Sequence, residues 1–208
     1  MIVVFYSDHM WNVALIIGFV LLASAAYASS RGAPWVPTWK RDLKRIEKLA
    51  QLKEGDRFVE LGCGTGRVCR HLAKQTKAQT HGVELSVLQW AYANLASFLS
   101  SRASVDRLAE GSRRFRDPSV RPAERALVGM TKKTKFFLGD AFHHDLSSYN
   151  VVYMFLMPKT YQKIRDKFTQ ELASGARVIT YVWPMPGWTP LYVDRVEGSP
   201  DLYVYEKK

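Results

Sequence analysis

A glycine-rich turn between two short hydrophobic strands constrains the fold of this chain more than any other feature. The strand predicted over residues 57–61 runs directly into Gly62-Cys63-Gly64-Thr65-Gly66. A helix follows over 67–77 and a second strand over 80–85. A strand, a crossover helix and a second strand of this length make a βαβ unit, in which the two strands are parallel. The sequence therefore predicts an α/β fold.

The hydrophobic segments around this unit extend it to a larger sheet. Three further helices are expected, over 38–52, 87–100 and 159–172. Five further strands are expected, over 135–139, 150–156, 176–183, 191–196 and 202–205. Gly198-Ser199-Pro200-Asp201 separates the last two strands and is typical of a hairpin. With 47% apolar and 24% charged residues, the 208-residue chain is neither disordered nor a coiled coil.

The glycine turn also has the features of a ligand-binding site. Glycines after a strand let the backbone approach a ligand closely, and an acid at the end of the next strand can bind ribose hydroxyls. Glu84 ends the second strand and suits that role, while Glu60 lies at the end of the first. The spacing Gly-x-Gly-x-Gly is not that of a dinucleotide site, and no Lys-Ser/Thr follows as in a P-loop. A purely structural turn is the alternative, and the two acids favour a ligand site.

These residues resemble a known superfamily. Residues 59–66, Val-Glu-Leu-Gly-Cys-Gly-Thr-Gly, look like the first motif of class I S-adenosylmethionine-dependent methyltransferases, and Gly139-Asp140-Ala141 resembles their adenine-side motif. The resemblance implies a seven-stranded Rossmann-like sheet, mostly parallel, with an antiparallel strand from a C-terminal hairpin. It implies S-adenosyl-L-methionine as cofactor, with no metal. The residues implied to bind it are Glu60, Gly62, Gly64, Thr65, Gly66, Glu84, Leu85, Asp140, Ala141 and Phe155.

A narrower resemblance covers nearly the whole chain. Three segments, at 32–38, 175–179 and 183–190, resemble those of membrane-associated protein-lysine methyltransferases. Mitochondrial members of that family modify the c-subunit of ATP synthase and the adenine nucleotide translocase. The resemblance implies an N-terminal hydrophobic anchor and a lysine acceptor. Residues 101–134 depart from the family as an insertion, which leaves the identity of the substrate open.

The N-terminal segment is long and apolar enough to cross a bilayer. Between Asp8 and Arg31 lie 22 residues without formal charge, and the apolar stretch over 10–28 approaches the roughly 20 residues that a spanning helix needs. A cleaved signal peptide ending near Ala26-Tyr27-Ala28 is the rival interpretation, but no basic residue precedes the stretch. A buried core helix is the third.

The flanks of this segment predict its orientation and the domain organisation. Basic residues follow it from Arg31 onward and none precedes it, so the positive-inside rule places the catalytic body in the cytoplasm. We expect a membrane anchor over 1–30, a pre-domain segment and helix over 31–54, and a methyltransferase domain over 55–208.

A lysine acceptor requires an aromatic pocket. An amine attacks only when neutral, and a normal lysine pKa of about 10.4 makes that cost roughly 4 kcal/mol near neutral pH. A poorly hydrated pocket lowers the pKa. Four aromatic residues are predicted to build it: Trp35, Tyr153, Trp183 and Trp188. The segment 153–158 lacks the Asn or Asp that enzymes acting on base amines often place there. His143-His144-Asp145 are interpreted as loop residues rather than a metal cluster.

The charge distribution of the chain bears on what it binds. The net charge is +11, all 30 basic residues follow Ser30, and ten of them lie within 102–135. Anionic lipid headgroups are a possible partner of that stretch, and a solvated surface is the plain alternative. Phe115 is its one aromatic residue, which makes nucleic acid an unlikely partner. We predict a membrane-anchored protein-lysine N-methyltransferase acting by in-line transfer. The alternatives are an RNA or DNA methyltransferase and a non-catalytic, cofactor-binding membrane scaffold.

Overall fold

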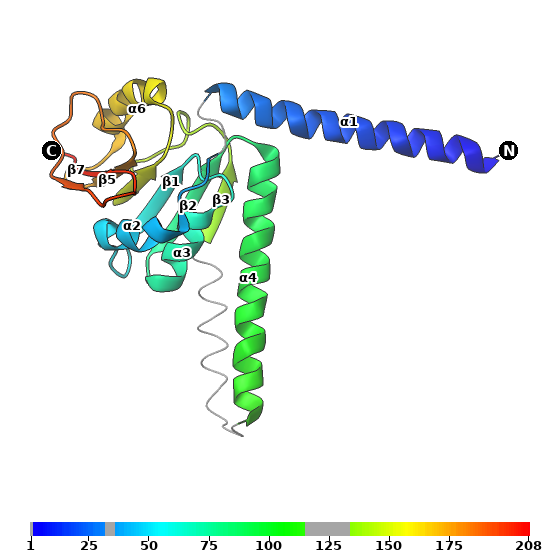
Figure 1. The fold of residues 1–208 in the computed structure, drawn as a ribbon, viewed down its shortest axis with the longest axis horizontal. Helices are drawn as coiled ribbons and strands as arrows, with labels where there is room; N and C mark the ends of the chain where they lie inside the picture. The colour runs from blue at the N-terminus through cyan, green and yellow to red at the C-terminus, as the bar shows by residue number, and fades with distance from the viewer. Residues whose placement is uncertain (1, 32–35, 115–133) are drawn as a thin grey trace.

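The computed structural model describes residues 2–31, 36–114 and 134–208 (Figure 1). In this part of the chain, seven strands and five α-helices follow one another, with one short 3₁₀ turn, η1, before α2. The helices are α1 (Ile2–Arg31), α2 (Leu43–Ala50), α3 (Arg67–Gln75), α4 (Val87–Arg114) and α6 (Pro158–Glu171), and η1 is Lys40–Asp42. The strands are β1 (Arg57–Leu61), β2 (Gln79–Glu84), β3 (Thr134–Leu138), β4 (Val151–Met154), β5 (Arg177–Tyr181), β6 (Tyr192–Asp194) and β7 (Leu202–Glu206).

All seven strands form one sheet in the order β3-β2-β1-β4-β5-β7-β6. The first five are parallel to their neighbours, and β7 runs antiparallel to both β5 and β6. This confirms the predicted seven-stranded, mostly parallel sheet with its C-terminal hairpin. Because the strand order reverses between β1 and β4, the carboxyl ends of these two strands flank the crevice in which such sheets bind ligands.

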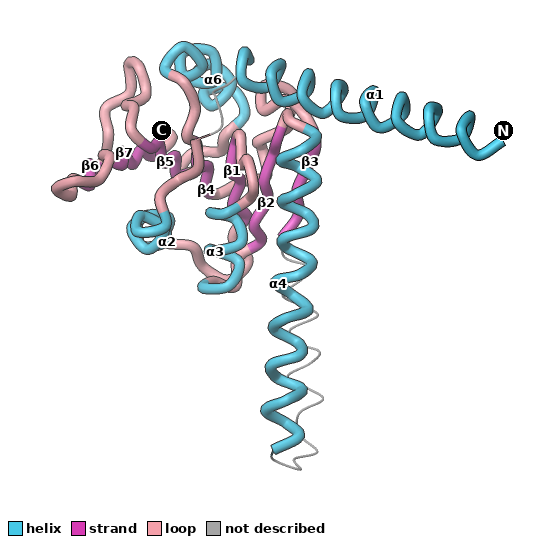
Figure 2. Tube along the Cα trace, turned by 45° about the vertical axis from the view of Figure 1, so that its right-hand side comes forward, coloured by secondary structure: helices cyan, strands magenta, loops and turns pink. Residues whose placement is uncertain are grey.

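The sheet is covered on both faces by amphipathic helices. Side chains alternate along each strand, so neighbouring residues such as Phe58 and Val59 enter different cores. Val59 packs in a cluster with Ile164 and Phe168 of α6. Phe58 packs with residues of α2 and α3 on the opposite face. Figure 2 shows α6 on one side of the sheet and α2 with α3 on the other.

Several predicted boundaries differ from those observed, and three of them matter for the site and for α4. The helix expected over 87–100 continues as α4 to Arg114, because residues 101–114 include four Arg and two Ala, which favour helix, and no proline. The first part of the predicted insertion is therefore helical, and the rest lies outside the described residues. Strand β4 ends at Met154, before Phe155 and Leu156. Strand β5 ends at Tyr181 because the next residue, Val182, has a φ of 73°.

The N-terminal helix α1 is continuous and projects from the domain (Figure 1). Its stretch Met10–Arg31 has a mean hydropathy of 2.0 and is long enough to cross a membrane. None of its most apolar window is buried, so the interpretation as a buried core helix is wrong. Only its last turns contact the domain, where the Ser24 hydroxyl accepts a hydrogen bond from the Val87 amide at 3.0 Å. Ser24 thereby satisfies a free amide in the first turn of α4.

Candidate active site

A cavity lies at the carboxyl edge of the sheet, beside the crevice between β1 and β4. Its walls come from the glycine turn, the end of β2, the loops after β3 and β4, and the last turns of α1. Nine of the ten predicted cofactor-binding residues line it: Glu60, Gly62, Gly64, Thr65, Glu84, Leu85, Asp140, Ala141 and Phe155. The topology thus brings together residues from four separate segments of the sequence.

The tenth predicted residue, Gly66, is not among the lining residues and instead permits close packing beneath the cavity. It caps the N-terminus of α3 with a φ of 67°, and a Cβ atom there would lie 2.4 Å from the Phe136 ring. Gly62 is restricted in a similar way, since its Cβ would lie 2.7 Å from Leu156. Gly64 has a φ of 52° and lines the cavity. The three glycines therefore have different tasks, and only Gly62 and Gly64 face the cavity.

Glu84 is held in place by two backbone amides. Its Oε2 atom accepts from the Gly64 amide at 2.7 Å and its Oε1 atom from the Ser86 amide at 2.8 Å. Burial raises the pKa of this carboxyl, and the amide hydrogen bonds oppose that shift. The Leu85 amide also hydrogen-bonds this carboxyl. A carboxylate has about four acceptor positions, so the three amides leave room for a further donor. The geometry fits an acceptor of two adjacent ribose hydroxyls.

Glu60 is a buried acid at the other side of the glycine turn. Its Oε2 atom accepts from the amide of Cys69 at 3.3 Å and from the thiol of Cys69 at 3.2 Å. Burial raises the pKa of Glu60 to about 8, so at neutral pH the carboxyl is largely protonated. A positively charged ligand group in the cavity would favour its ionised form. Burial also raises the pKa values of the Cys63 and Cys69 thiols, which are therefore not nucleophiles at neutral pH.

Asp140 connects the cavity to the N-terminal helix. Its Oδ1 atom accepts from the Phe142 amide at 2.9 Å, and its Oδ2 atom pairs with Arg31 Nη2 at 3.1 Å. Arg31 and the small residues Ala25, Ala28 and Ser29 also line the cavity. None of these four residues was predicted from the sequence to belong to the site. Their one signal was the helical spacing of small residues at the end of an otherwise bulky apolar stretch.

Tyr153 lies outside the cavity and supports its wall. The ring is fully buried, and the hydroxyl is 2.9 Å from Thr38 Oγ1. Thr38 lines the cavity, and its carbonyl accepts from Arg67 Nη1 at 2.7 Å. Tyr153 and Arg67 therefore hold the pre-domain segment against the glycine turn. Trp35 lies outside the described residues.

Residues 183–190 form a proline-rich loop, and its two tryptophans differ in their surroundings. Trp188 packs against the core, with its ring 6.4 Å from Phe168 and 6.0 Å from Tyr205. The sequence assigned Trp188 to the acceptor pocket and did not predict this packing. Trp183 is 42% exposed after β5, and the hydroxyl of Thr180 donates to its carbonyl at 2.6 Å. The described residues that line the cavity include neither Trp183 nor Trp188.

The His143-His144-Asp145 segment forms part of the turn after β3. His144 Nε2 is 2.9 Å from the Tyr149 hydroxyl, which also lies 2.8 Å from Nδ1 of the buried His81. Within residues 2–31, 36–114 and 134–208, no group of three or more His, Cys, Asp or Glu side chains is arranged to hold a metal.

The cavity lining fits S-adenosylmethionine in its chemistry. The cofactor carries a ribose diol, an adenine amine, and a positively charged sulfonium and ammonium. Glu84 offers a buried carboxylate for the diol, and Asp140 offers a carboxylate on the side of the cavity formed by the loop after β3. Glu60 can balance positive charge once it ionises. Gly62 and Gly64 leave room for close backbone approach.

Comparison with known proteins gives sequence relatives of one kind. A family model described as the ANTKMT methyltransferase domain matches residues 117–192. A protein-lysine N-methyltransferase of Saccharolobus islandicus is 27% identical over 176 residues, covering 83% of this chain and 91% of that protein. The human lysine N-methyltransferase of the ATP synthase c-subunit is 26% identical over 173 residues, covering 83% of this chain and 61% of that protein.

Solved structures with the same fold include RNA-modifying enzymes. The chain aligns with an RNA methyltransferase from Salinibacter ruber in complex with S-adenosyl-L-homocysteine, with a TM-score of 0.63 and 25% identity. The alignment covers 82% of this chain and 93% of that one. The rRNA methyltransferase aviRa from Streptomyces viridochromogenes shares the fold, with a TM-score of 0.55 at 13% identity, covering 83% of this chain and 86% of that one.

Proposed function

Since this chain is an S-adenosylmethionine-dependent methyltransferase resembling the lysine methyltransferases of the ATP synthase c-subunit and the adenine nucleotide translocase, we propose that it methylates a lysine of a membrane protein. The observation that carries the proposal is the position of α1. Four residues from its last two turns line the cofactor cavity. If α1 spans a bilayer, the cavity is at the membrane surface.

We assign the cofactor contacts to the lining residues. The bound cofactor supplies a methyl group activated by its positive sulfonium. Glu84 holds the ribose, Asp140 lies on the adenine side, and Glu60 balances the positive charge. The backbone of Gly62, Gly64 and Thr65 lies along the ligand, and Leu85 and Ala141 pack against it. Together these residues fix the position of the methyl group, so that transfer can occur in line.

The acceptor side has to desolvate an amine. Phe155, Leu156 and Phe142 give the cavity an apolar wall that favours the neutral form of an incoming lysine. We assign Trp183 to the entrance, since Trp183 follows β5 at the same sheet edge as Phe155. Tyr153 acts as a positioning residue through Thr38, and Trp188 supports the proline-rich loop from the core side.

Membrane anchoring gives this site its substrate class. We propose that α1 is a single-pass span and that the catalytic domain over 55–208 lies in the cytoplasm, joined by the segment 31–54. The basic residues that follow α1 support this orientation. A short connection between anchor and cavity raises the effective concentration of lysines near the bilayer without any new contact.

RNA methylation is the second candidate. The net charge of +11 and the alignment with the Salinibacter ruber RNA methyltransferase favour it. Segment 153–158 argues against it because it lacks an Asn or Asp that could hold a base amine.

A transfer assay separates the two candidates. The purified full chain is incubated with methyl-labelled cofactor and, in parallel, with membrane protein, soluble protein and RNA. We expect label on lysine in the membrane fraction, and none with the Gly64→Val chain. Label in RNA and none in protein would establish the second candidate, and no transfer to any fraction would favour a non-catalytic scaffold.

A further inference from the structure

The outward face of α4 is apolar where a soluble helix would be polar. Its inner face is marked by Ala93, which is fully buried, and by Trp90, whose indole donates to the Phe136 carbonyl at 3.0 Å. The opposite face carries four apolar side chains at the helical spacing i, i+4, i+7 and i+11. These are Leu88, Tyr92, Leu95 and Leu99, each between 48% and 55% exposed. We call these four residues the α4 stripe.

The stripe is unusual because an exposed helix normally presents charged and polar residues to water. Single exposed apolar residues are ordinary, but an aligned set marks an interaction surface. Phe98, 55% exposed, widens the surface on one side. No described part of the chain covers these residues, although α1 contacts α4 near its start.

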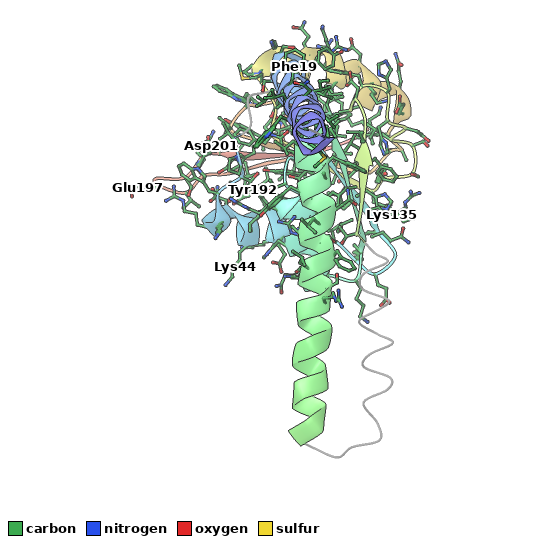
Figure 3. The ribbon with its side chains drawn as sticks, turned by 90° about the vertical axis from the view of Figure 1, so that its right-hand side faces the viewer. Phe19, Lys44, Lys135, Tyr192, Glu197 and Asp201 are labelled. Carbon is green, nitrogen blue, oxygen red and sulfur yellow. The ribbon has the colours of Figure 1, made fainter. Side chains whose placement is uncertain are left out.

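The position of α1 indicates what covers the stripe. The two helices meet where Ser24 binds the Val87 amide, one residue before the stripe begins. From there α1 extends away from the domain past α4, and the sheet lies on the opposite side of α4 (Figure 1). Figure 3 looks along α1, with Phe19 near the viewer, and α4 runs across the front of the domain. A bilayer crossed by α1 would therefore face the outer side of α4.

Charge agrees with a lipid surface as the partner. Arg102 continues the outward face one turn beyond the stripe, with its guanidinium 5.6 Å from the Phe98 ring centroid. It is the first of the ten basic residues within 102–135. Basic residues beside an apolar helix face are typical of helices that lie in the headgroup region of anionic membranes.

We propose that α4 lies in the plane of an anionic membrane, with the α4 stripe in the headgroup boundary. The inference rests on the proposed anchoring by α1 and adds a second contact. Gln89, in the first turn of α4, lines the cofactor cavity. The membrane-lying helix therefore fixes the cavity at headgroup depth and selects lysines at that depth, rather than any lysine within reach of a flexible tether.

The test measures the depth of single labelled positions in the full chain. Cysteine replaces Leu95 in the stripe, Ile16 in α1, or the exposed Lys44 of α2, and carries a fluorophore that is quenched from water. The native cysteines Cys63 and Cys69 are buried, which protects them from labelling. The chain is reconstituted in vesicles of phosphatidylcholine with phosphatidylserine. We expect the labels at 16 and 95 to be quenched several-fold less than the label at 44.

Three other results would each contradict a specific part of the proposal. Shielding at 16 with full quenching at 95 rejects the membrane-lying α4 and leaves the anchor intact. Full quenching at both positions rejects the anchor and the inference with it. Shielding at 95 that persists in lipid-free protein and rises with protein concentration would assign the stripe to a second copy of the chain.

A charge substitution adds an independent readout. Leu95→Glu together with Leu99→Glu should weaken shielding of a label at Tyr92 several-fold, because carboxylates are repelled by the anionic surface. Asn94→Glu is the matched control, since Asn94 is exposed on the flank of the same helix. Equal shielding in the double variant and the control would contradict the proposal, provided that circular dichroism shows both chains folded.

Discussion

The two halves of the sheet contribute to the cavity in different ways. From β1 and β2 come glycines and carboxylates that all lie between Glu60 and Glu84 in sequence. From the β5–β7 half, the two predicted tryptophans do not line the cavity: Trp188 packs against the core and Trp183 is exposed after β5. In the proposed assignment the β1–β2 half, which we call the cofactor half, binds a ligand of fixed chemistry by its backbone, and a short motif can encode such a site. The β5–β7 half, which we call the acceptor half, is completed by segments distant in sequence, including the end of α1.

The largest expected effect in the cofactor half comes from Gly64→Val. A branched side chain at a φ of 52° is strained, and it would project where the backbone meets the cofactor. We expect calorimetry to detect no cofactor binding. Gly175→Val is the matched control, because Gly175 has a φ of 82° with open space around it. Binding by the Gly64 variant at wild-type affinity would place the cofactor elsewhere.

Glu84→Ala should have the next largest effect. Losing a hydrogen bond to a charged group costs about 1.5–3 kcal/mol, which corresponds to roughly 10–150-fold weaker cofactor binding. Glu84→Gln, which keeps one acceptor oxygen, should fall between the variant and wild type. Titration calorimetry at constant pH measures all three chains. Identical affinities would mean that the carboxylate only supports the glycine turn and does not touch the ribose.

Glu60 makes the stability of the cofactor-free chain depend on pH. Its pKa is raised from 4.5 to about 8 by burial, so it stabilises the fold when protonated. That contribution is complete below about pH 4.5 and is lost as the pH rises to about 8, with a slope of at most about 1.4 kcal/mol per pH unit. We measure the free energy of unfolding in urea at about pH 5 and at about pH 8. The decrease between these two pH values should be smaller for Glu60→Gln than for wild type.

The same acid links cofactor binding to protons. Because a positive ligand favours the carboxylate, binding near neutral pH should release a proton from Glu60. Calorimetry in buffers of different ionisation enthalpy detects this release, which Glu60→Gln should abolish. Equal proton release by both chains would show that another group titrates.

The two tryptophans of the acceptor half should separate stability from turnover. Trp188→Ala opens a space against the core and should lower the free energy of unfolding by about 1–3 kcal/mol. Trp183→Ala removes a half-exposed ring and should change stability by no more than about 0.5 kcal/mol, while lowering the rate of methyl transfer to protein. A turnover unaffected by Trp183→Ala would remove that residue from the proposed entrance.

The sequence predicted most of the fold because its signals are local. The glycine turn, the alternating strands and the Gly198-Ser199-Pro200-Asp201 turn each depend on a few adjacent residues, and all correspond to observed elements. The length of α4 was missed because charged residues that form helices well were interpreted as a solvated insertion. Residues such as Arg31 and Thr38 were missed because a contact across the fold leaves no pattern at either position. The packing of Trp188 against the core was not predicted because proline-rich surroundings do not reveal which ring packs inward.

Mass spectrometry of membrane proteins tests the central claim most directly. Cells that produce the wild-type chain are compared with cells that produce the Gly64→Val chain. We predict that lysine methylation at a position near the membrane surface is present with the wild-type chain and lost with the variant. Unchanged lysine methylation in the membrane fraction, together with a methyl group lost from RNA, would contradict the account.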